Sequence, residues 1–163
     1  MAPPPRTWSP HELVAAPYHV ALLDSTPSPA LVADVRQRVL HGPGVATLEG
    51  FLSDEALADA LADARRRAPH AFTSRSRHNV YLLPAPDPSL PQEHVRNRLL
   101  ETTVASVACD ELDPHGALHA LYFGRAGDQL LELVSQATGQ RLYKLDDPLG
   151  ALSINVFRPG MQQ

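Results

Sequence analysis

The 163-residue sequence has a single cysteine, Cys109, and no long apolar run. One cysteine excludes an internal disulfide framework. No stretch approaches the roughly 18 apolar residues that a membrane-spanning helix needs. The first residues, Met1 to Pro5, have neither the basic nor the apolar region of a signal peptide. These absences predict a cytoplasmic protein with no membrane partner.

The sequence also lacks a long block of one charge. Its formal net charge of −4 is spread along the chain, whereas proteins that bind polyanions usually gather basic residues into patches or tails. We therefore expect no nucleic-acid partner.

Complete catalytic motifs are missing as well. The sequence has no His-x-Asp or His-x-Glu triplet, no HExxH, no CxxC, no GxSxG and no glycine-rich phosphate loop. His115 and His119 have the i, i+4 spacing that puts two imidazoles on one helix face, but no third ligand lies nearby. Cys109 follows an apolar pattern, which favours a buried thiol over a reactive one. These residues therefore predict no metal site and no nucleophile.

Helix signals are clearest in the first half of the chain. Residues 1–29 hold seven of the 16 prolines and predict an irregular proline-rich arm ahead of a single domain spanning 30–163. Pro29 to Leu40 has apolar residues at helical spacing behind a serine that can cap it. Ser53 precedes a second helix, which has acids in its first turn and Arg65 to Arg67 in its last.

The remaining elements are predicted from the hydrophobic period. Short strands are expected at 45–51 and 80–83, with a polar run at 70–79 between helix and strand. Helical spacing predicts a helix from Pro91 to Cys109 and shorter helices at 114–123 and 128–137. Arg141–Leu145 and Ala151–Phe157 flank a turn-rich stretch and predict a hairpin. The order of helices before strands favours an α+β fold.

Candidate site residues are polar side chains on predicted strands, where alternate positions face one side. One group consists of Arg75, Arg77, His78, Asn79 and Tyr81, of which Asn79 and Tyr81 could share one wall of a cavity. A second group lies near the C-terminal hairpin: Tyr143, Asn155 and Arg158. Alternation places Asn155 opposite Ile154 and Val156, on the wall of a cavity. The alternative to a cavity wall is an ordinary solvent-exposed face.

The stretch from Arg141 to Gly160 (RLYKLDDPLGALSINVFRPG) resembles bacterial iron(II)/2-oxoglutarate-dependent oxygenases, as does Arg77 to Tyr81. In that family a similar run leads into a Trp-His-x-Asp type sequence with the first iron ligands. The resemblance implies the N-terminal part of a double-stranded β-helix, a jelly-roll or cupin-like incomplete barrel with helices buttressing one sheet.

The same resemblance implies Fe(II) and 2-oxoglutarate as cofactors of a longer parent enzyme, with none bound to this chain alone. It implies hydroxylation or related C–H chemistry on a small or amino-acid-like molecule. Tyr143, Asn155 and Arg158 would bind the cofactor, and the segment from Arg75 to Tyr81 would lie near the substrate. The iron ligands would follow Gln163, so we expect a truncated domain.

Two other classes remain open at this point. The chain could be a non-catalytic fragment. It could instead be a binding or regulatory module that pairs its open strand edge with a partner, including a second copy of itself, because an exposed edge offers unpaired main-chain groups.

Overall fold

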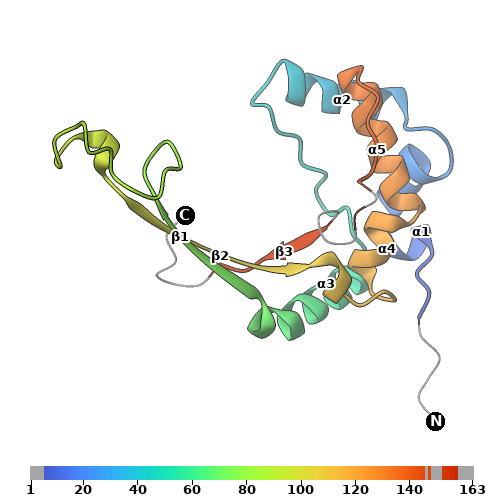
Figure 1. Cartoon of the computed structure of the whole chain (residues 1–163). Helices are drawn as coiled ribbons and strands as arrows, with labels where there is room; N and C mark the ends of the chain where they lie inside the picture. The colour runs from blue at the N-terminus through green and yellow to red at the C-terminus, as the bar shows by residue number, and fades with distance from the viewer. Residues whose placement is uncertain (1–5, 146, 148–151, 158–163) are drawn as a thin grey trace, which may run out of the picture.

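The computed structural model describes residues 6–145, 147 and 152–157. Within these ranges the chain forms five α-helices and three β-strands, joined by short 3-10 and π turns (Figure 1). The helices are α1 (Pro10–Leu13), α2 (Pro29–Leu40), α3 (Asp54–Arg67), α4 (Ala117–Phe123) and α5 (Arg125–Thr138). The strands are β1 (Phe72–His78), β2 (Leu100–Ala108) and β3 (Ser153–Asn155). The helices gather into one body, and β1 and β2 extend away from it.

Serine caps set the starts of α2 and α3. The Leu31 N–H donates to Ser28 Oγ at 3.3 Å, and the Ala56 N–H donates to Ser53 Oγ at 3.2 Å. Such caps satisfy donors that the first helical turn leaves free. The helices predicted at 29–40, 53–67, 114–123 and 128–137 are confirmed, and they correspond to α2, α3, α4 and α5. Gly139 ends α5 with a φ of 71°, a left-handed conformation that suits glycine.

The hydrophobic core lies between the helices in two clusters. The first combines Trp8, Leu13, Val14 and Leu23 with alanines of α3, α4 and α5. The second joins Leu22 and Val35 to Leu133 and Ala137 of α5. Much of this core comes from the segment before α2, predicted as an irregular arm. From residue 6 onward that segment carries α1 and two short turns and packs into the body.

The sheet is antiparallel, with strand order β1-β2-β3. β1 pairs with β2 along its whole length, from Phe72 opposite Ser106 to His78 opposite Leu100. β3 pairs only with the end of β2 nearest the body, where Asn155 lies opposite Ser106. We call β1, β2 and the connection between them, residues 72–108, the ribbon. Residues 79–98 are the ribbon tip.

This architecture corrects the predicted fold class. The α+β class is right, but the double-stranded β-helix is wrong, because the described residues form one small open sheet and no second sheet faces it. The helices form their own core rather than buttressing a barrel. No helix in the described part of the chain is long and apolar enough to cross a membrane.

Several local predictions are also wrong. The predicted helix at 91–109 contains β2 instead, because β-branched Thr102, Thr103 and Val104 favour a strand that can pair with β1. The predicted strand at 80–83 is a turn, and β1 lies in the polar run before it. Residues 45–51 are irregular. Arg141–Leu145 forms no strand, so β3 pairs with β2 rather than completing the predicted hairpin.

Candidate functional site

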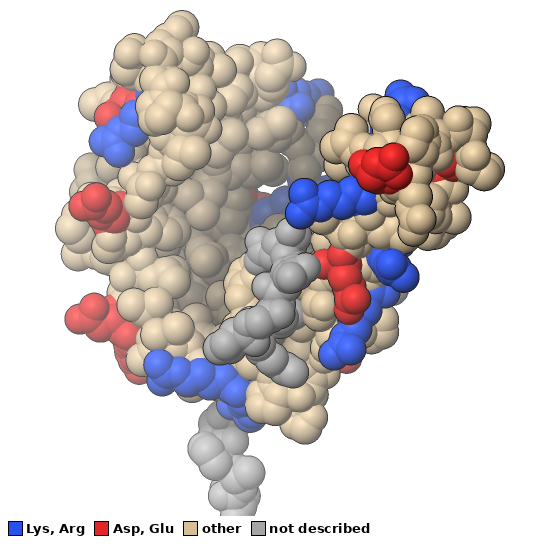
Figure 2. All heavy atoms as spheres, turned by 90° about the vertical axis from the view of Figure 1, so that its left-hand side faces the viewer, with Lys and Arg blue, Asp and Glu red and all other residues tan. Residues whose placement is uncertain are grey.

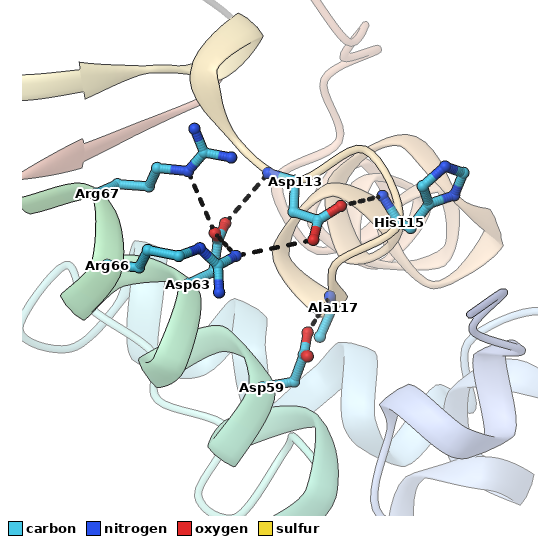
Figure 3. A network of polar contacts seen from close by, with 7 residues as sticks. All are labelled: Asp59, Asp63, Arg66, Arg67, Asp113, His115 and Ala117. Carbon is cyan, nitrogen blue, oxygen red and sulfur yellow. Dashed lines mark hydrogen bonds and ion pairs between the residues drawn. The ribbon is translucent and has the colours of Figure 1, made fainter. Parts of the chain in front are cut away.

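The most buried charged side chain of the described chain is Asp63 on α3, which exposes only 4% of its surface. Its Oδ1 accepts hydrogen bonds from Arg66 and Arg67 of the same helix, and its Oδ2 accepts the Asp113 N–H at 3.2 Å (Figure 3). One turn earlier, Asp59 Oδ2 accepts the Ala117 N–H at 2.7 Å. We call this set of contacts the α3–α4 clamp.

The clamp is a structural anchor. Both oxygens of Asp63 are occupied by partners within the chain, so neither is free to bind or protonate a substrate. The carboxylates join α3, which leads into β1, to the segment between β2 and α4 (Figure 3). Because both ends of the ribbon are tied here, the clamp fixes the ribbon relative to the helical body.

The arginines at the end of α3 and on β1 differ in whether they have a partner. Residues 64–86 contain five arginines and two histidines but no Asp or Glu. Arg66 and Arg67 are held by Asp63. Arg65, Arg75 and Arg77 are exposed, and among the residues that the structure describes none of the three has a hydrogen-bond or ion-pair partner. This acid-free stretch is a local basic region that the overall net charge of the chain does not reveal.

Arg75 and Arg77 occupy one face of the ribbon. They are two residues apart on β1, so their side chains leave the same face of the strand. Thr103 lies opposite Arg75 and Glu101 lies opposite Arg77. Glu101 is the only acid on β1 or β2. Figure 2, which views the molecule from the ribbon side, shows basic and acidic side chains on this part of the surface.

The other predicted substrate residues lie where β1 runs into the ribbon tip. His78 is half-buried and its Nε2 lies 3.4 Å from Thr102 Oγ1. Asn79 is buried, and its Oδ1 accepts hydrogen bonds from the Tyr81 and Leu83 N–H groups. Tyr81 is exposed and lies beside Arg96. The structure therefore gathers the predicted group along one end of the ribbon, with Asn79 shaping a turn.

The three residues predicted to bind a cofactor do not form one described site. Asn155 is exposed on β3, not partly buried as alternation suggested. Tyr143 is also exposed and lies beside a hollow of about 390 Å³ between α4 and α5. The hollow is lined by leucines, and its cation, Lys144, pairs with Asp128 at 2.6 Å. Arg158 lies outside the described residues.

Of the remaining reactive residues, His115 is exposed, whereas His119 packs against an aromatic ring and Cys109 is buried. No group of three or more potential metal ligands occurs among the described residues. His119 packs against Phe123 with ring centroids 4.5 Å apart. Cys109 is buried, as predicted, and burial together with the neighbouring charge of Asp110 raises the pKa of its thiol. A raised pKa leaves less thiolate and therefore a less reactive cysteine.

Comparison with known proteins gives one partial similarity. No family model matches the sequence, and no solved structure matches it significantly. Among curated proteins, the chain is similar to a tRNA (guanine-N(7)-)-methyltransferase of Nitrosomonas europaea, with 31% identity over 83 residues. The matched stretch is 49% of this chain and 37% of the relative. The chain thus spans little more than a third of that protein's length.

This similarity corrects the functional expectations. Membership of the iron(II)/2-oxoglutarate oxygenases finds no support in the family models, and the relative is named for methyl transfer, not for oxidation. The expectation of Fe(II) and 2-oxoglutarate as cofactors is therefore wrong on this finding. The expectations of a small-molecule substrate and no nucleic-acid partner are also wrong on this finding, because the relative is named for an activity on tRNA.

Proposed function

We propose that this chain is an RNA-contacting part of an RNA-modifying methyltransferase, and that the ribbon holds RNA by its phosphates. The observation that carries the proposal is a pair of exposed arginines on one face of the ribbon, Arg75 and Arg77, for which the described residues supply no hydrogen-bond or ion-pair partner. The partial similarity to a tRNA methyltransferase supports the choice of RNA.

The geometry suits a phosphate backbone. A guanidinium offers a rigid fork of donors that matches the oxygens of a phosphate. The spacing of about 6.7 Å between alternate residues of a strand is comparable with the distance between neighbouring phosphates of a nucleic-acid strand. Because no partner in the described chain neutralises Arg75 or Arg77, binding a phosphate costs no existing ion pair. Such contacts position RNA without reading its sequence.

The described residues do not fit a methyl donor such as S-adenosylmethionine. In doubly wound folds, adenosine-containing cofactors lie at a glycine-rich turn between a parallel strand and a helix. The three described strands are antiparallel. The described glycines with positive φ, at positions 44, 50 and 139, do not lie between a strand and a helix. We therefore assign RNA binding, and no methyl-transfer step, to this part of the chain.

Binding of unmodified tRNA, measured by fluorescence anisotropy, tests the proposal. The double variant Arg75→Gln/Arg77→Gln should lose about tenfold or more in affinity, because two charge-assisted contacts are removed. The control Arg38→Gln/Arg141→Gln removes the same net charge. Arg38 pairs with Asp34 on α2, and Arg141 lies over Tyr143 after α5, so neither belongs to the ribbon.

The two double variants separate specific contacts from overall charge. Equal loss in both would mean that net charge alone governs binding, and the ribbon would have no special part. Absence of tRNA binding by the unaltered chain would overturn the proposal outright. Circular dichroism of each variant checks that the helical body is intact.

A further inference from the structure

An aromatic side chain at the ribbon tip is left open to solvent beside a cation. Tyr81 is 56% exposed. The Arg96 guanidinium lies over its ring, with Cζ 4.8 Å from the ring centroid, and Arg96 Nε donates to the Tyr81 hydroxyl at 3.3 Å. Tyr81 belongs to neither cluster of the helical core, and more than half of its surface faces solvent.

Two buried asparagines build the scaffold under this side chain. Asn79 is 2% exposed and Asn97 is 7% exposed, although the tip has no apolar core of its own. Asn97 Oδ1 accepts the Asp87 N–H at 2.7 Å, and its Nδ2 donates to the carbonyls of Asp87 and Pro91. Buried amides that use both their oxygen and their nitrogen hold loops in one conformation.

The turn that carries Tyr81 contains an unfavourable backbone conformation. Leu82 has a φ of 61°, a left-handed value that is unfavourable for leucine. Asn79 maintains it, because its side chain accepts the Tyr81 N–H at 2.9 Å and the Leu83 N–H at 3.1 Å. The result is a fixed presentation of Tyr81 to solvent.

We infer that Tyr81 and Arg96 form a stacking platform for an unpaired RNA base, a role that rests on the proposed RNA binding. Single-stranded bases stack on exposed aromatic rings and on arginine guanidinium planes, and this contact tolerates any base. The platform lies at the end of the ribbon whose β1 strand carries Arg75 and Arg77. The ribbon thus offers phosphate contacts on β1 and base stacking at its tip.

The full chain is tested with a short single-stranded RNA that carries one fluorescent 2-aminopurine. Stacking on Tyr81 should quench the fluorescence on binding. Tyr81→Leu keeps an apolar side chain but removes the ring, and it should weaken affinity by roughly tenfold and abolish the quenching. Tyr81→Phe keeps the ring and loses only the hydroxyl, so it should bind within about twofold of the unaltered chain.

A probe of the same length with abasic sites separates stacking from phosphate binding. The unaltered chain and Tyr81→Leu should bind it equally, because it has no base to stack. Unquenched binding of the labelled RNA, or equal affinity of Tyr81→Leu and the unaltered chain for it, would overturn the platform. In that case, sensitivity to Arg75→Gln/Arg77→Gln would leave the proposed function standing. Failure of every probe to bind would overturn both.

Discussion

The helical body and the ribbon are stabilised in different ways. In the body, buried apolar side chains from α1, α3, α4 and α5 interlock in one cluster, and those of α2 and α5 in a second. In the ribbon, the fully buried apolar side chains are Ala105 and Val107, near the end of β2 that reaches the body. Beyond them, main-chain pairing and two buried asparagines maintain the structure.

The difference separates the region that holds the buried core from the region that carries the proposed RNA contacts. A two-stranded unit is only marginally stable in water on its own. Because the ribbon also has little buried core, it adds little to the stability of the folded chain. Its side chains are correspondingly free to contact a partner. The α3–α4 clamp connects the two regions, so the stable body fixes the position of a surface that adds little stability itself.

The largest expected effect comes from truncating the same side chain in the two regions. Leu133→Ala in the body should lower the free energy of unfolding by about 3 kcal/mol, since a buried leucine leaves a cavity. Leu133 is 1% exposed, whereas Leu83 of the ribbon tip is 53% exposed. Leu83→Ala should cost less than about 0.5 kcal/mol. Urea denaturation of both variants measures the contrast, and equal costs would contradict the division into two regions.

The next largest effect is expected at the clamp. Asp63→Ala leaves Arg66, Arg67 and the Asp113 N–H without their shared acceptor, and it should destabilise the chain by about 2 kcal/mol. The control is Asp34→Ala, which removes an exposed i, i+4 partner of Arg38 and should cost under about 0.5 kcal/mol. If the two variants unfold at the same urea concentration, the clamp has no anchoring role.

The reactivity of Cys109 measures how far solvent reaches the junction between β2 and the helical body. Because burial raises its thiol pKa, alkylation by iodoacetamide at mildly alkaline pH should be at least about tenfold slower in the folded chain than in urea. The folded pKa lies above the unfolded one, so this group's contribution to stability is present below the unfolded pKa and is lost as the pH rises through the folded pKa. Fast alkylation of the folded chain would show an open junction.

The smallest expected effect has the opposite sign. Glu101 lies opposite Arg77 and is the acid on the strands that would repel a phosphate. Glu101→Gln should therefore strengthen tRNA binding by about two- to threefold, with no loss of stability. Glu132→Gln on α5 is the control, because it removes the same charge from the body. A gain in the control of the same size would indicate a general charge effect.

The helices could be predicted because their signals are local. Ser28 and Ser53 mark helix starts, and Gly139 marks a stop, by hydrogen bonds and backbone conformations that depend on neighbouring residues. The strands of the ribbon could not be predicted in this way. β1 is exposed on both faces, so its sequence, FTSRSRH, has no apolar alternation to detect. β2 has valines at helical spacing, and only its pairing with β1 decides for a strand.

The candidate site was predictable in part. The family resemblance places Arg75, Arg77 and Tyr81 near a substrate, and the same residues carry the present proposal, with RNA in place of a small molecule. Overall net charge does not reveal this local basic stretch, because the acids that balance its arginines all lie outside residues 64–86. Asn79 was expected to line a cavity, but it forms a turn instead, through hydrogen bonds that depend on the local chain path.

The salt dependence of tRNA binding tests the central claim most directly. A protein that contacts phosphates releases counterions, so the logarithm of its affinity falls linearly with the logarithm of salt concentration. If Arg75 and Arg77 each contact a phosphate, the double variant Arg75→Gln/Arg77→Gln should show a slope shallower by about 1.4–1.8 than that of the unaltered chain. Arg38→Gln/Arg141→Gln should leave the slope unchanged. Identical slopes for the unaltered chain and the ribbon variant would contradict the assignment of RNA binding to the ribbon.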